Sequence, residues 1–322
     1  MTKFKAWISA ARLRTLPLSV SGIIVGAVLG HRYYFNQKIE LLDRELDGLA
    51  SMAHESFVET LIFWLAIATT LGLQILSNFA NDYGDGVKGT DNEDRVGPQR
   101  ALQSGAITKK EMFKGIVITA ILTLIVAIAL IYEAFGATYF FYSVFFFVLG
   151  LASIAAAIKY TMGNTAYGYR GLGDVFVFIF FGLVSVVGCY FLYTKNLNLI
   201  IFLPAIAIGL LSAAVLNLNN MRDHDSDKKA GKNTLVVKLG IQRARTYHFS
   251  LIILAMIAML TFLYFTYENT MNLLFLIAFI PLLVHIRKVV VTKKSELLDP
   301  ELKKVALSTF LLSILISIGQ IF

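Results

Sequence analysis

Long apolar runs, separated by short segments that carry most of the Lys and Arg residues, repeat along almost the whole of this 322-residue chain. A helix that crosses the hydrocarbon core of a bilayer needs about 20 mostly apolar residues. About nine runs meet this requirement. They are Leu16–Gly30, Phe57–Asn78, Gly115–Tyr132, Tyr139–Ile158, Val175–Tyr193, Leu199–Leu218, Tyr247–Phe265, Leu273–Val291 and Val305–Phe322. The pattern predicts an all-α integral membrane protein, with residues 1–322 forming a single polytopic domain.

Composition excludes the soluble alternative. The chain is 57% hydrophobic and only 16% charged, whereas soluble domains are about 25% charged. The net charge of +8 does not indicate nucleic acid as a partner, because the basic residues lie between apolar runs, as membrane topology requires. The expected surroundings are membrane lipid. The single cysteine, Cys189, excludes an intramolecular disulfide.

The distribution of cations predicts the orientation. If the N-terminus lies in the cytoplasm, all but four of the 29 Lys and Arg residues fall on the cytoplasmic side, as the positive-inside rule demands. The four exceptions are Arg32, Lys38, Arg44 and Lys195. Residues 31–56 then form the one long polar connection on the outer side, where we expect a short amphipathic helix.

Two polar segments, residues 78–110 and 217–240, share an unusual spacing on the predicted cytoplasmic face. An Asn or Asp precedes an Asp by four positions in three pairs: Asn81 and Asp85, Asn219 and Asp223, and Asp223 and Asp227. This spacing places side chains on one face of a helix, where like charges repel each other. The matched segments indicate a duplicated half and are the first candidates for the catalytic site, although solvated acidic residues at helix ends remain the alternative for either segment alone.

A divalent cation would offset the repulsion between these carboxylates. Carboxylate and amide oxygens suit Mg²⁺, which retains water molecules and readily shares a phosphate of its substrate. The candidate metal ligands are Asp85, Asp91, Asp94, Asp223 and Asp227. Nearby cations could neutralise a departing diphosphate, although membrane topology alone also accounts for cations here. The candidate diphosphate ligands are Lys88, Arg95, Arg222 and Lys232.

A third polar segment, Tyr167–Asp174, joins the fourth and fifth predicted spans on the same face. Its glycines permit a tight turn. Asp174 could cap the fifth helix, and the tyrosines could be interfacial anchors. The alternative is that the segment lines an aromatic acceptor pocket, for which the candidates are Asn78, Tyr167, Tyr169 and Asp174.

These motifs resemble those of the UbiA superfamily of intramembrane prenyltransferases. Residues 81–89 (NDYGDGVKG) with 94–98 (DRVGP) resemble the first aspartate motif of that family, and residues 219–235 resemble the second. Together with the segment 167–174 (YGYRGLGD), the sequences of both motifs are most similar to those of the branch that prenylates 1,4-dihydroxy-2-naphthoate in menaquinone synthesis. Leu13 and Ala166 stand where family members often have proline, which leaves the local backbone shape open.

The resemblance implies a UbiA-type helical bundle and a reaction. Two Mg²⁺ ions and basic residues would hold a polyprenyl diphosphate and stabilise the charge that develops as its C–O bond breaks. The acceptor would be 1,4-dihydroxy-2-naphthoate, with carbon dioxide lost and demethylmenaquinol formed. The enzyme would lie in the cytoplasmic (inner) membrane of a bacterium, with its active site facing the cytoplasm.

Other functions remain open from the residues. Related family members use 4-hydroxybenzoate or homogentisate as acceptor. An internal duplication would also suit a cation-coupled transporter. Such a transporter would be expected to carry acidic residues in the middle of its spans. In this chain Glu59 and Glu133 lie near the ends of spans, which argues against a transporter.

Overall fold

The computed structural model describes residues 2–45, 56–90, 97 and 99–322, without the side chains of residues 38–45. Helices make up most of the described chain, and the described residues contain no β-strand. The all-α prediction is therefore confirmed for this part of the chain.

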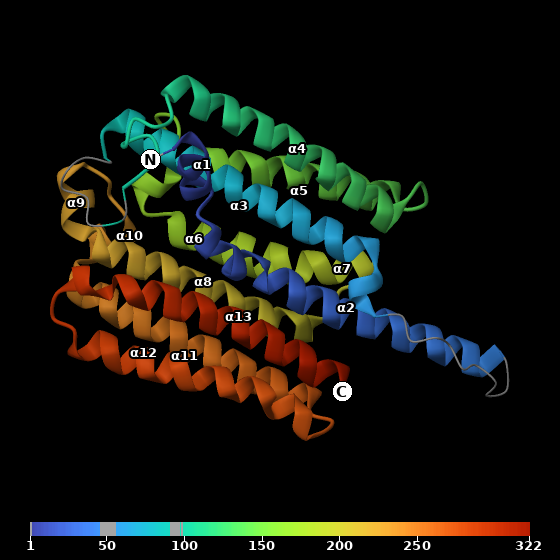
Figure 1. Cartoon of the computed structure of the whole chain (residues 1–322). Coiled ribbons are helices and arrows are strands. Elements are labelled where there is room, and N and C mark those ends of the chain that lie inside the picture. Colours follow the sequence, from blue (N-terminus) through green and yellow to red (C-terminus); the bar gives the residue numbers. More distant parts are fainter. Residues whose placement is uncertain (1, 46–55, 91–96, 98) are drawn as a thin grey trace.

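The helices form one elongated bundle, with their axes roughly aligned (Figure 1). The first part of the chain consists of α1 (Lys3–Ala11), η1 (Leu13–Thr15), α2 (Leu16–Glu45), η2 (Phe57–Glu59), α3 (Leu61–Lys88), α4 (Lys109–Phe135) and α5 (Phe140–Lys159). The middle consists of η3 (Tyr167–Arg170), α6 (Gly173–Val177), η4 (Phe178–Gly188), α7 (Cys189–Thr194), η5 (Leu199–Ile201), α8 (Phe202–Arg222), α9 (His224–Lys229) and α10 (Leu235–Leu239). The last part consists of α11 (Ile241–Thr266), η6 (Thr270–Ala278), α12 (Phe279–Val291), η7 (Ser295–Leu298) and α13 (Asp299–Ile321).

Nine helical stretches in the described residues are long and apolar enough to cross a membrane, which confirms the expected number. The two ends of the chain lie at opposite ends of the bundle (Figure 1), as an odd number of crossings requires. Many large apolar side chains on the outside of the bundle are exposed, including Phe141 at 84% and Phe145 at 63%. An apolar exterior of this kind is suited to lipid rather than to water.

Two predicted boundaries differ from the structure in a way that affects the site. The expected second span ended at Asn78, but α3 continues to Lys88 before Gly89 adopts a left-handed conformation (φ 73°) and ends it. Asn81 and Asp85 therefore lie on the helix and not in a loop after it. In the same way α2 continues to Glu45, so the helix expected in residues 31–56 extends the first span.

The fifth span is one continuous rod whose middle section, η4, has π-helical hydrogen bonding. A π-helical turn is wider than an α-helical turn and leaves a local bulge. Gly182 on this section lies against α8 so closely that a Cβ atom would be 2.5 Å from the carbonyl oxygen of Ala205 and 2.7 Å from Cα of Gly209. The absence of side chains at this contact lets the two backbones approach each other.

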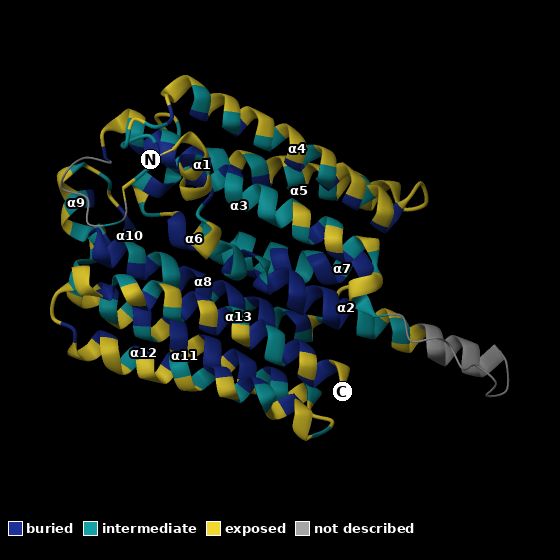
Figure 2. Cartoon of the chain, viewed as in Figure 1, coloured by how far each residue is buried: buried dark blue, intermediate teal, exposed yellow. Residues whose placement is uncertain are grey.

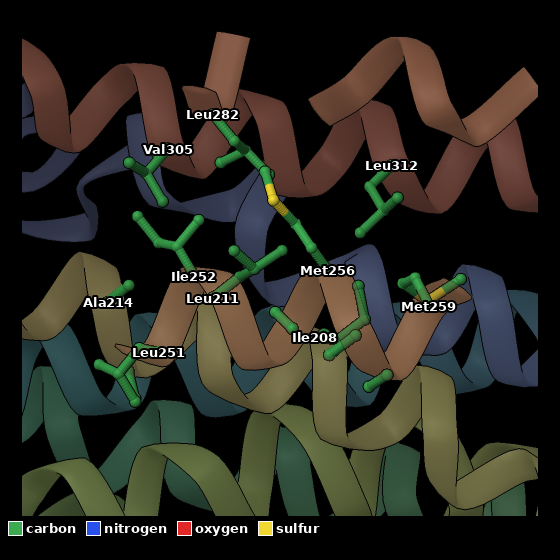
Figure 3. Close-up of a cluster of buried hydrophobic side chains, with 14 of the residues drawn as sticks. Ile208, Leu211, Ala214, Leu251, Ile252, Met256, Met259, Leu282, Val305 and Leu312 are labelled. Atoms are coloured by element: carbon green, nitrogen blue, oxygen red, sulfur yellow. The ribbon is translucent and has the colours of Figure 1, made fainter. Parts of the chain in front are cut away.

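The largest buried cluster lies between α8, α11, α12 and α13. Figure 3 shows Ile208 and Leu211 of α8 near Ile252 of α11, and the side chain of Met256 extending toward Leu282 of α12. Buried residues are concentrated along α8 and α2 in the interior, whereas α4, α5 and α12 present exposed faces (Figure 2). The buried central helices fix the positions of the segments that meet at one end of the bundle.

Candidate active site

The three polar segments predicted from the sequence meet at one end of the bundle, where α6, α9 and α10 lie (Figure 1). The hydroxyl of Tyr169 donates a hydrogen bond to Oδ1 of Asp85 over 2.8 Å. The ammonium of Lys232 lies 3.6 Å from Oδ2 of Asp85 and 3.7 Å from Oδ1 of Asp227. The first motif, the second motif and the η3 segment therefore form one site.

Close packing of the last turns of α3 places Asp85 there. A Cβ atom on Gly84 would be 2.5 Å from Oγ1 of Thr161 and 2.8 Å from its carbonyl carbon. Only a glycine allows this approach. The Thr161 hydroxyl in turn donates to the Ala80 carbonyl oxygen over 2.9 Å and lies 3.3 Å from Oδ1 of Asn81. Gly84 thus lets α3 pack against the connection between α5 and η3.

Lys232 joins the two acidic motifs electrostatically. Its side chain is 12% exposed and those of Asp85 and Asp227 are 4% and 6% exposed. Burial favours the neutral amine, but attraction by Asp85, and then by Asp227, outweighs it and holds the pKa of Lys232 above its ordinary value. The site therefore holds a cation between two carboxylates.

Tyr169 supports this arrangement. Burial, and then the negative charge of Asp85, raise the pKa of its phenol, so the hydroxyl keeps the proton that it donates to that carboxylate. Its hydroxyl also lies 2.6 Å from Oγ1 of Thr90. The ammonium groups of Lys88 and Lys232 lie 3.9 Å and 5.4 Å from the centre of its ring, within the range of cation–π attraction.

Asp223 is bound in a fork by the neighbouring Arg222. The guanidinium donates from Nε to Oδ1 over 2.8 Å and from Nη2 to Oδ2 over 2.6 Å. Nη2 also donates to Oδ1 of Asn219 over 3.0 Å, and Nη1 donates to Oδ1 of Asp299. Bidentate pairing of this kind fixes the direction of a carboxylate.

Asp82 of the first motif contacts a different set of residues from Asp85. Its side chain is fully buried, and Oδ1 lies 3.6 Å from Nη2 of Arg12 and 3.4 Å from Nε of Arg100. Arg12 has a left-handed backbone (φ 51°), which is uncommon for a residue other than glycine and is often found at functional sites. This conformation turns the chain from α1 into α2 beside the site.

A cavity of about 580 Å³ opens at the site and continues into the bundle. Its polar end is lined by Arg12, Asn81, Asp85, Arg100, Asn219 and Lys232. Its far end is lined by Ala66, Leu130, Phe146 and Leu192. Because Ala66 and Asp85 lie on the same α-helix, which rises 1.5 Å per residue, the cavity extends about 28 Å, close to the hydrocarbon thickness of a membrane. The space thus fits an amphiphile with a charged head and a long apolar chain.

Some of the remaining predicted residues line this cavity and others do not. Asn78, Tyr167 and Arg222 line it. Asp174 does not line the cavity, and its carboxylate is hydrogen-bonded to Tyr247 of α11. The candidates Asp91, Asp94 and Arg95 lie outside the described residues.

Several charged residues that line the cavity were not among the predicted site residues, and Arg12, Asp299 and Lys303 lie outside both motif segments. Their distance in sequence from both motifs explains why spacing gave no signal for them. Arg12 precedes the first predicted span yet pairs with Asp82 of the first motif, and Asp299 is 77 residues from Arg222.

The donor atoms at this site fit Mg²⁺. The described residues contain no group of three or more His, Cys, Asp or Glu side chains that could form an all-protein metal cage. Mg²⁺ usually binds through one or two carboxylates, with water and substrate phosphate completing its shell. Asp85 and Asp227 already converge on one cation, the Lys232 ammonium, so their oxygens can face a positive charge between them.

The helical membrane bundle and its cavity, which has a polar, cationic end and an apolar interior, suit an intramembrane prenyltransferase. The chain belongs to the UbiA prenyltransferase family, which matches residues 48–314. It is 39% identical over 320 residues, covering 98% of this chain and 96% of the relative, to a Haemophilus influenzae protein described as 1,4-dihydroxy-2-naphthoate octaprenyltransferase.

Solved structures share the fold. The apo structure of a UbiA homolog from Aeropyrum pernix K1 superposes with a TM-score of 0.61 at 16% identity, over 96% of this chain and 98% of that one. A UbiA homolog from Archaeoglobus fulgidus, solved with DMAPP and Mg²⁺ bound, gives a TM-score of 0.51 at 17% identity, over 95% of this chain and 99% of that one.

Proposed function

We propose that this protein transfers a polyprenyl group from polyprenyl diphosphate to 1,4-dihydroxy-2-naphthoate, releasing carbon dioxide and diphosphate and giving demethylmenaquinol. The proposal rests on one cavity about 28 Å long, which joins residues of both motifs and nearby cations at its polar end to an apolar interior. The name of the Haemophilus influenzae relative supports the acceptor.

The polar end of the cavity would bind the diphosphate group of the donor. Lys232 and Arg100 line it and supply positive charge where the leaving group acquires negative charge. Tyr169 keeps Asp85 in position through its hydrogen bond. Mg²⁺, held by Asp85, Asp223 and Asp227 together with the diphosphate, would supply Lewis-acid stabilisation of that leaving group. The Mg²⁺ bound with DMAPP in the Archaeoglobus fulgidus homolog is consistent with this role.

The remaining chemistry depends on position and on exclusion of water. Breakage of the allylic C–O bond leaves its electron pair on the diphosphate, and the resulting cation is attacked by an electron-rich ring carbon of the acceptor. Loss of the acceptor carboxylate as carbon dioxide returns an electron pair to the ring. The apolar walls of the cavity would keep water from the allylic cation, and Asn78 and Tyr167 lie where they could contact the acceptor.

The same proposal places the site in the cytoplasmic membrane of a bacterium, at the cytoplasmic face. The positive-inside distribution supports this orientation, because the site lies at the end of the bundle with the Lys- and Arg-rich segments. Lys195, one of the four exceptions, directly follows α7, which lies toward the opposite end (Figure 1).

The test is a product assay with the purified full chain, Mg²⁺, a polyprenyl diphosphate and each of three acceptors in turn. We expect a prenylated, decarboxylated product by mass spectrometry with 1,4-dihydroxy-2-naphthoate, and none with Asp85→Ala. Prenylation of 4-hydroxybenzoate or homogentisate instead would overturn the acceptor assignment. Full activity of the Asp85→Ala protein would overturn the assignment of the site.

A further inference from the structure

The first turn of α13 brings another carboxylate to the site. Asp299, the first residue of that helix, accepts a hydrogen bond at Oδ1 from Nη1 of Arg222 over 2.5 Å. The two residues are 77 positions apart and both line the cavity. The Arg222 side chain is 1% exposed, whereas that of Asp299 is 43% exposed. The ninth span therefore contacts the second acidic motif directly.

Arg222 faces two carboxylates at once. Nε and Nη2 of its guanidinium hold Asp223, and Nη1 holds Asp299. One positive and two negative charges give this group of three a net charge of −1. Without Asp299, the Arg222–Asp223 pair would be neutral, and a neutralised carboxylate attracts a cation more weakly.

We propose that Asp299 is a positioning residue for the magnesium–diphosphate site, holding the Arg222 guanidinium so that Asp223 keeps its direction and enough negative charge to bind a cation. The inference rests on the proposed function, because it assumes that Asp223 takes part in binding Mg²⁺. Asp299 acts through Arg222 and not by contact with the reacting atoms.

A purely mechanical role makes a different prediction. If Asp299 only fastened α13 to α8, its loss would lower thermal stability without changing the affinity for Mg²⁺. If it sets the charge and direction of Asp223, Asp299→Asn weakens Mg²⁺ binding by about tenfold, because a unit charge close to a cation site has an effect of that order at an effective dielectric constant of about 20.

The experiment is isothermal titration of Mg²⁺ into the full chain in detergent, with saturating inorganic diphosphate and no prenyl donor. Asp299→Asn is compared with wild type and with Glu296→Gln, which removes one exposed negative charge from η7 at a residue that does not line the cavity. Asp299→Glu, which retains the charge, provides a second variant should Asp299→Asn fold poorly. Thermal unfolding of each variant is measured in parallel.

We expect a dissociation constant about tenfold higher for Asp299→Asn, and constants within about twofold of wild type for Asp299→Glu and Glu296→Gln. Wild-type affinity in Asp299→Asn, or an equal loss in Glu296→Gln, overturns the inference. A wild-type protein that binds no Mg²⁺ with diphosphate overturns the metal-dependent function itself, and the role of Asp299 with it.

Discussion

Replacement of Lys232 by Met isolates the electrostatic link between the two acidic motifs. The methionine keeps most of the length of the side chain but removes the ammonium that lies 3.6 Å from Asp85 and 3.7 Å from Asp227. The two carboxylates then face each other with no cation from Lys232 between them. The protein without ligands should be less stable, and Mg²⁺ should restore much of the loss by taking the position of the ammonium.

The distances give the size of the effect. At an effective dielectric constant of about 20, a pair of unit charges 4 Å apart attracts by about 4 kcal/mol, and relief of the desolvation of Lys232 offsets part of the loss. Removal of one partner from a buried pair typically costs about 3 kcal/mol or more. For a chain of this length that corresponds to a fall in Tm of roughly 5 °C.

Thermal unfolding in detergent, monitored by tryptophan fluorescence with and without millimolar Mg²⁺, measures both parts of this prediction. Lys228→Met is the matched control, because Lys228 is exposed on α9 and does not line the cavity. We expect Mg²⁺ to raise the Tm of Lys232→Met more than that of wild type or of the control. An unchanged Tm in Lys232→Met, or equal stabilisation of all three proteins by Mg²⁺, would show that the Lys232 ammonium does not link the two carboxylates.

Three further changes test other parts of the structure. Asp227→Asn should lower the rate of product formation by at least about 100-fold, since even changes outside the first coordination shell cost 10- to 100-fold; a rate within threefold of wild type would contradict its role. Gly84→Ala should lower Tm by an amount equivalent to about 1–2 kcal/mol, because the new Cβ would be 2.5 Å from Thr161 Oγ1. Gly150→Ala, which has nothing within 4 Å of its Cβ, should not lower Tm. Asp82→Asn should cost about 3 kcal/mol of stability, because it removes the charge of a fully buried carboxylate that faces two guanidinium groups; an unchanged Tm would disprove that ion pairing.

The sequence predicted the membrane bundle well because the bilayer imposes a simple condition on it. Each span must be apolar over its whole length, so hydropathy alone located nine crossings that the described residues confirm. The same argument could not give the ends of the helices. Polar residues continue α2 to Glu45 and α3 to Lys88, because hydrogen bonding along a helix does not stop where hydropathy falls.

Within the site, the spacing of residues predicted which segments meet but not which side chains pair. The four-residue step brought out Asp85 and Asp227, which converge on Lys232. It did not predict the bidentate pairing of Arg222 with Asp223, nor the hydrogen bond from Arg222 to Asp299 of the ninth span. Those contacts depend on how helices distant in sequence pack together, and local spacing carries no record of that packing.

A structure with Mn²⁺ in place of Mg²⁺ and a non-reactive prenyl diphosphate analogue would show whether the two acidic motifs form one metal–diphosphate site, because anomalous scattering locates the ions. We predict ion peaks beside carboxylates of both acidic motifs, with the diphosphate between Asp85 and Asp227 and the prenyl chain in the apolar cavity. Ions bound at only one motif, or a diphosphate bound outside this cavity, would contradict the account.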